Sequence, residues 1–212
     1  MHPPYLSTDR LALRAMVADD ALVASDWFPA AFPVNADQAG RWLREQHRTS
    51  PWDGPTRLWL AVVRIGEHDP NSSIPRQTVV GGVTMSHPRD RTTDVQIRIA
   101  PSIEHAEADG LQAEVIRLLV PWARDELETM VVTVAIGSDQ PASVTAAQEL
   151  GMLPAARLRE HLARPGRRAD LLWFQALNAG RRIPAVAGAP AELSLVPAGD
   201  GADGTGGEGR DA

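Results

Sequence analysis

The chain has 212 residues, enough for one domain of ordinary size with a short extension. With 43% hydrophobic and 23% charged residues, its composition is that of a globular protein. It contains no cysteine, which excludes disulfide scaffolds, zinc ribbons, iron–sulfur clusters and thiol nucleophiles. All 21 basic residues are arginine, which excludes Schiff-base and P-loop lysine chemistry. The formal net charge of −6 argues against a general nucleic-acid binder.

The ends of the chain predict its organisation. No apolar run approaches the roughly 18 residues that span a bilayer, and the first residues lack the basic and apolar regions of a secretory signal. We therefore expect a cytoplasmic protein that binds neither membrane nor nucleic acid. Residues 1–182 are expected to form the folded domain. Residues 183–212 are rich in alanine, glycine and proline, carry a net charge of −4, and predict a disordered acidic tail.

The first half of the domain predicts a strand, two helices and three further strands. Residues 10–14 alternate as a short strand. One helix is expected to begin at Asp19-Asp20 and to end before Pro29, and a second to be capped by Asn35 or Asp37 and to run to His47. Residues 58–65, 78–85 and 94–99 have the composition or alternation of strands, and turn residues separate them. Together they predict an antiparallel meander.

The second half predicts a helix, a buried strand, a helix and a hairpin. Apolar residues recur at helical spacing over residues 109–128, with Pro121 expected to kink or split that helix. Residues 130–136 form an apolar run typical of a central strand. Pro141 suits the first turn of a helix that ends at Gly151. Strands are expected at residues 157–162 and 170–176, turning at Gly166.

Five short motifs occur in this order of elements. They are STDRLALR at residues 7–14, VGGV at 80–83, GLQAEV at 110–115, Ser143 followed by ELGM at 149–152, and RE at 159–160 followed by DLL at 170–172. The series resembles the GNAT superfamily of acyl-CoA-dependent N-acyltransferases, and within it the branch that acetylates ribosomal-protein N-termini. The resemblance implies an α/β (α+β) fold with a mixed, mostly antiparallel sheet of about seven strands flanked by about four helices.

The resemblance also implies a site. In such proteins acetyl-CoA, or another acyl-CoA, lies between the strand carrying Ile97, Ile99 and Ala100 and the strand carrying residues 132–135. Its pyrophosphate rests at a helix start, which corresponds here to His105, Ala108, Asp109 and Gly110, because unpaired N–H groups and the helix dipole attract an anion. Gln140 takes the place of an asparagine that commonly touches the pantetheine arm, and Ser143 is a further candidate for contact with the cofactor. A backbone N–H of the splayed strand is expected to polarise the acyl carbonyl while a free amine attacks directly.

Catalytic candidates follow from the same alignment. Ser143 could protonate the departing thiolate or contact the cofactor, although a serine at a helix start is commonly a cap. Asp94, Glu104, His87 and His105 are candidate general bases, and each has an ordinary surface role as its alternative. No pair among the six histidines has metal-ligand spacing together with a carboxylate, so no metal is expected. The acceptor is expected to be a small amine or a protein N-terminus, and the protein a monomer or homodimer.

The cofactor loop departs from the family pattern. The family has [QR]-x-x-G-x-[GA], whereas residues 105–110 read HAEADG and retain only the final glycine. Glu107 and Asp109 allow two interpretations: they repel the pyrophosphate, or they cap the helix and stabilise it. The first predicts a weakened, partner- or ligand-binding domain, and the second a conventional N-acyltransferase. Both interpretations remain open at this point.

Overall fold

The computed structural model describes residues 5–20, 35, 37–38, 40–41, 57–66, 77–86 and 92–178. The chain divides into two compact units, Met1–Arg181 and Arg182–Ala212, and every described residue belongs to the first. The predicted tail at 183–212 and the candidate base His87 lie outside the described residues, and the tail remains a prediction.

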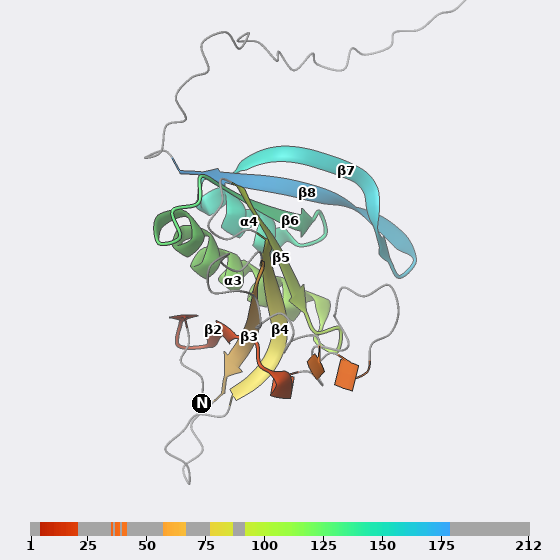
Figure 1. The fold of residues 1–212 in the computed structure, drawn as a ribbon. Helices are drawn as coiled ribbons and strands as arrows, with labels where there is room; N and C mark the ends of the chain where they lie inside the picture. Colours follow the sequence, from red (N-terminus) through yellow and green to blue (C-terminus); the bar gives the residue numbers. More distant parts are fainter. Residues whose placement is uncertain are drawn as a thin grey trace, which may run out of the picture. The chain divides into compact units, whose positions relative to one another are not determined.

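The described residues form a mixed sheet in the order β1-β2-β3-β4-β5-β6-β8-β7 (Figure 1). The strands are β1 Leu6–Ser7, β2 Leu11–Ala15, β3 Arg57–Ile65, β4 Gln77–Ser86, β5 Thr92–Ile99, β6 Val131–Gly137, β7 Leu153–Arg164 and β8 Arg167–Leu177. The antiparallel meander is confirmed over β3, β4 and β5, while β6 runs parallel to β5. Over the described residues the sheet has eight strands rather than about seven, because β1, only two residues long, is too short to show a period.

Two α-helices have complete described bounds, α3 His105–Asp125 and α4 Pro141–Glu149. Of the two helices predicted before them, the first corresponds to a 3₁₀ helix, η1 Ala18–Asp20, and its remainder lies outside the described residues. The second is helical where it is described. Its cap is Asn35, whose Oδ1 accepts from the Gln38 N–H at 2.9 Å, while Gln38 Oε1 accepts from the Asn35 N–H at 3.2 Å. This reciprocal capping box confirms Asn35 as the start signal.

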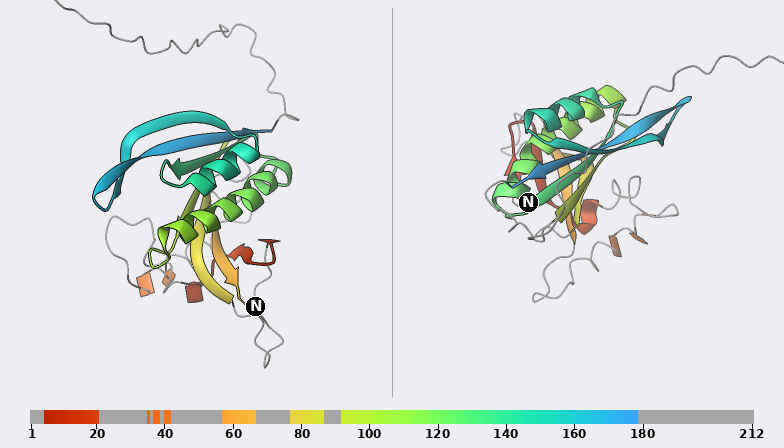
Figure 2. Two further views of the ribbon diagram at one scale, coloured as in Figure 1. Left: turned by 180° about the vertical axis from the view of Figure 1, so that it is seen from behind. Right: turned by 90° about the horizontal axis from the view of Figure 1, so that it is seen from above.

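Helix α3 begins at His105, four residues before the predicted start, and it continues through Pro121 without being split. Its buried residues include Leu111, Val115 and Leu119, as the period predicts, and also Ile116 and Val120. The buried face is wider than one stripe because α3 packs against both the sheet and α4. Figure 2 shows the two helices side by side against one face of the sheet.

The end of α4 confirms the predicted glycine stop. Gly151 has φ +69°, in the left-handed region, and its N–H donates to the Gln148 carbonyl at 2.9 Å. The Met152 N–H donates to the Ala147 carbonyl at 3.0 Å, which completes a Schellman motif. The chain then enters β7, and the β7–β8 hairpin turns at Gly166, also with φ +69°, as predicted.

Candidate functional site

Strands β5 and β6 pair along only part of their length. Their register runs from Thr92 opposite Val131 to Val95 opposite Val134, and no pairing follows. Beyond that point β5 stays with β4, and the Ala100 N–H donates to the Val80 carbonyl at 2.9 Å. The two strands therefore separate in a V, as the resemblance implies. A cavity of about 990 Å³ lies along the opening.

The glycine pair in β4 explains how closely β5 follows β4. A Cβ on Gly81 would lie 2.5 Å from the Arg98 carbonyl oxygen and 3.0 Å from Ile99 Cδ1, so a larger residue would push β5 away. β4 also carries an irregularity, since Val62 pairs with Gly81 and Val63 with Val79, which leaves Val80 without a register partner on β3. The VGGV motif thus shapes the strand that lines the cavity.

The separated part of β5 offers backbone groups to the opening. Hydrogen-bonded and non-bonded pairs alternate along an antiparallel ladder. Since the Ala100 N–H donates toward β4, the N–H and C=O of Ile97 and Ile99 are directed to the other side, where β6 has left. Their side chains pack against the main core below α3. This part of β5 is therefore held in place by β4 and by the core, while its backbone N–H and C=O groups on the other side are not paired with β6.

Seven of the residues that sequence analysis singled out line the cavity: Asp94, Ile97, Ile99, Ala100, His105, Ala108 and Gln140. Four others are absent from the lining: Glu104, Asp109, Gly110 and Ser143. Glu104 is the exposed N-cap residue of α3. Gly110 is exposed in the second turn, because the helix begins five residues earlier than the glycine. The geometry supports neither Glu104 as a base nor Gly110 as a phosphate contact.

Asp109 and Ser143 form a buried pair with a structural task. The carboxylate of Asp109 accepts from the N–H groups of Ala142 at 2.8 Å and Ser143 at 2.9 Å, and from Ser143 Oγ at 2.6 Å. These N–H groups belong to the first turn of α4, which has no side-chain cap of its own. Asp109 therefore caps α4 from α3, rather than capping its own helix. Ser143, fully buried and engaged in this contact, does not reach the cavity.

Glu107 also lies outside the cavity lining. Its carboxylate pairs with the guanidinium of Arg64 on β3. With Asp109 turned to α4 and Glu107 to Arg64, neither acidic side chain of the degenerate loop lines the cavity. Of the two interpretations that the sequence left open, this arrangement does not favour direct repulsion of the pyrophosphate by these two side chains.

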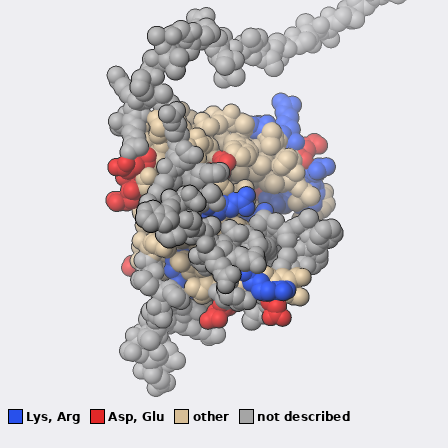
Figure 3. All heavy atoms as spheres, viewed as in Figure 1, with Lys and Arg blue, Asp and Glu red and all other residues tan. Residues whose placement is uncertain are grey.

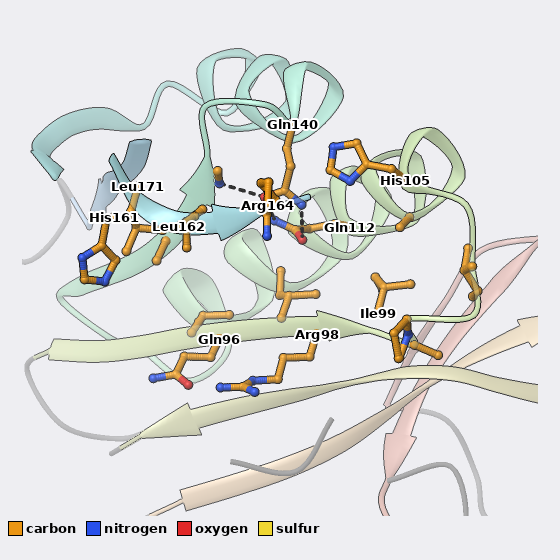
Figure 4. Close-up of a pocket in the computed structure, with 18 of the residues that line it drawn as sticks. Gln96, Arg98, Ile99, His105, Gln112, Gln140, His161, Leu162, Arg164 and Leu171 are labelled. Atoms are coloured by element: carbon orange, nitrogen blue, oxygen red, sulfur yellow. Dashed lines mark hydrogen bonds between the residues drawn. The ribbon is translucent and has the colours of Figure 1, made fainter. Parts of the chain in front are cut away.

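A glutamine pair holds the helix-side wall. Gln140 Nε2 donates to Gln112 Oε1 at 2.9 Å, and Gln140 Oε1 accepts from the Gly137 N–H at 2.7 Å (Figure 4). This joins the end of β6 to α3 at the edge of the cavity. Gln140 was predicted from its motif position, whereas nothing in the sequence pattern distinguished Gln112.

Asp139 links three basic side chains beside this wall. Its carboxylate, only 3% exposed, lies 2.8 Å from Arg164 Nε, 3.3 Å from Arg167 Nη2 and 3.7 Å from His105 Nε2. His105 Nε2 also lies 3.0 Å from the Asp139 carbonyl oxygen. The hydrogen bond from Arg164 holds the pKa of Asp139 below its ordinary value. The cluster fastens the β7–β8 hairpin to the start of α3.

An irregularity in β7 adds a residue that sequence analysis missed. The register with β8 shifts between Leu158 and Leu162, and Glu160 has φ +48°. Asp170 accepts the Glu160 N–H at 2.8 Å and pairs with Arg157, and these bonds lower the pKa of Asp170. His161, next to the shift, lines the cavity (Figure 4). A bulge has no clear sequence period, so no signal marked His161.

The paired part of β5 and β6 contributes Asp94 to the lining of the cavity. Asp94 lies opposite Thr133, whose hydroxyl donates to its carboxylate. Within the described lining, Asp94 is the one carboxylate, together with two arginines, Arg98 and Arg164, and two histidines. The described lining therefore carries basic side chains from α3, β5 and β7 and a single carboxylate.

The donor set suits an anionic, elongated ligand better than a metal. The described residues contain no group of three or more His, Asp or Glu side chains that could hold a metal ion. Among the helices described, none is both long and apolar enough to cross a membrane. The first turn of α3 contributes His105 and Ala108 to the lining. The Ala108 N–H donates to the Glu104 carbonyl at 2.8 Å, so the N–H groups at residues 105–107 are the ones that lack a partner within the helix and can attract an anion. These features fit the phosphates and arm of an acyl-CoA.

Comparisons with known proteins agree with this geometry. Residues 3–153 match the family model described as an acetyltransferase (GNAT) domain. A crystal structure from Sphaerobacter thermophilus DSM 20745, assigned as an acetyltransferase, is 37% identical, covers 84% of this chain and 99% of its own, and superposes with a TM-score of 0.60. The spermidine N-acetyltransferase of Vibrio cholerae in complex with CoA and spermine is 17% identical, covers 81% and 97%, and has a TM-score of 0.52.

The second structure shares the fold alone, whereas the family match extends over most of the domain. No curated protein matches the chain. Because the family model covers more than half of the sequence, the chain belongs to the GNAT acetyltransferase family.

Proposed function

We propose that this GNAT family member is an acyl-CoA-dependent N-acyltransferase, which moves an acetyl or related acyl group to a primary amine by direct attack. The observation that carries the proposal is the separation of β5 from β6 after Val95 and Val134, which opens the cavity of about 990 Å³. A continuous ladder at this point would leave no room for a pantetheine arm. Acyl-CoA supplies the activated acyl group, and the chain supplies its placement.

The residues of the opening have distinct tasks in this proposal. The N–H groups of Ile97 and Ile99, which point away from β4, donate to the pantetheine arm and to the acyl carbonyl. Gln140 and Gln112 bound the arm on the helix side. The start of α3 receives the phosphates. Since the sheet already holds these backbone N–H groups in place, they lose no conformational freedom when acyl-CoA binds.

The amine approaches from the part of the cavity that carries Asp94 and His161. Asp94, held by Thr133, attracts the ammonium form of the acceptor, and either Asp94 or His161 takes the proton that leaves the amine. Ser143 has no part in the reaction, because its hydroxyl is buried and bonded to Asp109.

For the acceptor, the sequence resemblance supports a protein N-terminus, and the Vibrio cholerae relative, which binds spermine, supports a small polyamine. A polycation is poorly matched to a described lining with one carboxylate and two arginines. We therefore propose an acceptor with a single amine, either a peptide N-terminus or a small molecule.

Calorimetric titration with acetyl-CoA and free CoA, followed by a thiol-release assay over peptides, polyamines and small amines, tests the proposal. We expect binding of both nucleotides and acyl transfer to a mono-amine. Binding without transfer to any acceptor would favour the alternative of a weakened, ligand-binding domain. If the protein bound neither acetyl-CoA nor CoA, the proposal would be contradicted. The dependence of kcat on pH is then compared between wild type, Asp94→Asn and His161→Gln. The variant in which kcat no longer rises with pH identifies the residue that accepts the proton.

A further inference from the structure

The β7–β8 hairpin is basic in an otherwise acidic protein. Between Leu153 and Leu177 it carries five arginines against Glu160 and Asp170, whereas the whole chain has a net charge of −6. Figure 3 shows arginine side chains over the part of the surface that Figure 1 assigns to this hairpin. Of the five, only Arg164 lines the cavity.

Arg164 is oriented by a buried carboxylate. Its Nε donates to Asp139 Oδ2 at 2.8 Å and its Nη2 to Asp139 Oδ1 at 3.3 Å, so one edge of the guanidinium is fixed. The Nη1 group has no partner among the described residues. Because Asp139 also contacts Arg167 and His105, the cluster keeps a net positive charge even though it contains a carboxylate.

The position of Arg164 is close to the proposed phosphate site. Arg164 shares Asp139 with His105, the first residue of α3, and both basic residues line the same cavity as Ala108 (Figure 4). Arg164 also lies beside the glutamine pair that bounds the arm. The two acidic side chains of the loop are engaged elsewhere, by Arg64 and by α4. The local field therefore favours an anion.

The sequence of the loop explains why a long basic side chain is needed. Where the family pattern has a glycine that lets a phosphate approach the backbone, this chain has Ala108, and where the pattern has a glutamine or arginine it has His105. A methyl group at Ala108 holds a phosphate further from the helix N–H groups. An arginine that reaches in from the hairpin can donate to a phosphate in that outer position.

We propose that Arg164, oriented by Asp139, binds the phosphates of the acyl-CoA donor and replaces the basic glycine-rich loop that this chain lacks. The proposal rests on the proposed function, since it concerns the same donor. It assigns to the hairpin a role in binding the donor, in addition to forming one edge of the sheet. The shared chemistry is an esterified phosphate, and CoA carries it in two places, the pyrophosphate and the 3′-phosphate.

The test is calorimetric titration of the full chain with CoA, dephospho-CoA and pantetheine, for wild type, Arg164→Gln and the control Arg168→Gln. Arg168 lies on the same hairpin but does not line the cavity. We expect Arg164→Gln to weaken CoA binding by about 10- to 100-fold, as for loss of a charge-assisted hydrogen bond. Arg168→Gln should stay within about twofold, as expected for an exposed charge. Pantetheine, which has no phosphate, should bind both variants as it binds wild type.

The nucleotides separate the possible sources of the phosphate. Equal weakening of CoA and dephospho-CoA assigns Arg164 to the pyrophosphate, and weakening of CoA alone assigns it to the 3′-phosphate. Unchanged affinity for both would overturn the proposal. So would equal weakening of pantetheine, since that indicates a disturbed cavity. Failure of wild type to bind CoA would instead contradict the proposed function.

A second variant keeps the proposal testable if Arg164→Gln fails to fold. Arg164→Lys keeps the positive charge near Asp139 but lacks the planar fork. We expect it to melt within a few degrees of wild type and to weaken CoA binding by a smaller factor, about 3- to 10-fold. The CoA affinity of Arg164→Lys is also measured at low and at raised salt. If it equals the wild-type affinity at low salt and falls no more steeply than the wild-type affinity when salt is added, that result would also count against a direct phosphate contact.

Discussion

Asp109 shows how one side chain can have a role that its position in a motif does not reveal. It lies where the family pattern contacts a phosphate, yet it is 4% exposed and caps the neighbouring helix. We expect Asp109→Asn to lower the free energy of unfolding by about 2–3 kcal/mol, because an amide NH₂ would then face N–H donors in a buried site. Urea denaturation measures this change.

The matched control for that experiment is Glu107→Gln, which removes a charge from the same loop. Glu107 and its partner Arg64 are 51% and 39% exposed, so the expected loss is under about 1 kcal/mol. Neither substitution should tighten CoA binding. A clear gain in CoA affinity in either variant would show that the acidic side chains oppose the pyrophosphate after all.

Asp139 provides a pH-dependent prediction at the same scale. Its pKa lies below the ordinary carboxyl value because of the hydrogen bond from Arg164, so ionised Asp139 stabilises the folded state. That stabilisation is complete above the unfolded pKa, near 3.9, and is lost as the pH falls through the lower folded value. We expect Asp139→Asn to cost about 1–3 kcal/mol at pH 7 and progressively less below about pH 4.

Urea denaturation of wild type and Asp139→Asn at pH 7, 5 and 3 gives the difference at each pH. The exposed Asp125, paired with Arg124 on the surface of α3, is the control position, and Asp125→Asn should change the midpoint little. A difference for Asp139→Asn that stays constant down to pH 3 would contradict the assigned ion-pair role.

At the scale of elements, each of the two α-helices contains or ends at a glycine, and the position of that glycine decides whether replacing it raises or lowers the stability of the protein. Gly110 is exposed inside α3, and a Cβ there would meet no atom within 4 Å. We expect Gly110→Ala to stabilise the protein by about 0.5–1 kcal/mol through helix propensity. Its CoA affinity should be unchanged, because Gly110 does not line the cavity.

Gly151→Ala makes the opposite change at the end of α4. A Cβ there also has open space, but φ is +69°, so the cost is conformational and about 1–2 kcal/mol. Thermal melting of the two variants should therefore shift in opposite directions by about 2–4 °C. Shifts of the same sign would show that the backbone conformation at one of these glycines is wrongly assigned.

The elements that the sequence predicted best are those with a strong local signal. The apolar run of β6, the alternation of β5, Pro141 at the start of α4 and Gly151 at its end are all local features. The start of α3 was predicted four residues late. Its first turn, from His105 to Ala108, is largely exposed and lacks the apolar period that defines the rest of the helix.

At the scale of the whole molecule, the acidic extension remains a prediction. Residues 183–212 are rich in glycine, alanine and proline and carry a net charge of −4, so they are not expected to bury apolar surface against the domain. We expect truncation after Arg182 to leave the melting temperature within about 1 °C, because no burial would be lost. Differential scanning calorimetry of the full and truncated chains checks this. A melting temperature several degrees lower would show that the extension docks.

The order of strands and helices, and with it the family, is a property of the sequence by itself, because hydrophobic period and turn residues act within a few neighbours. The candidate site is different in kind. That Asp109 serves α4, that Glu107 pairs with β3, and that Arg164 and His161 reach the cavity from a hairpin more than 50 residues away from β5 depend on contacts between distant segments. Such contacts have no local period, so only the tertiary structure decides them.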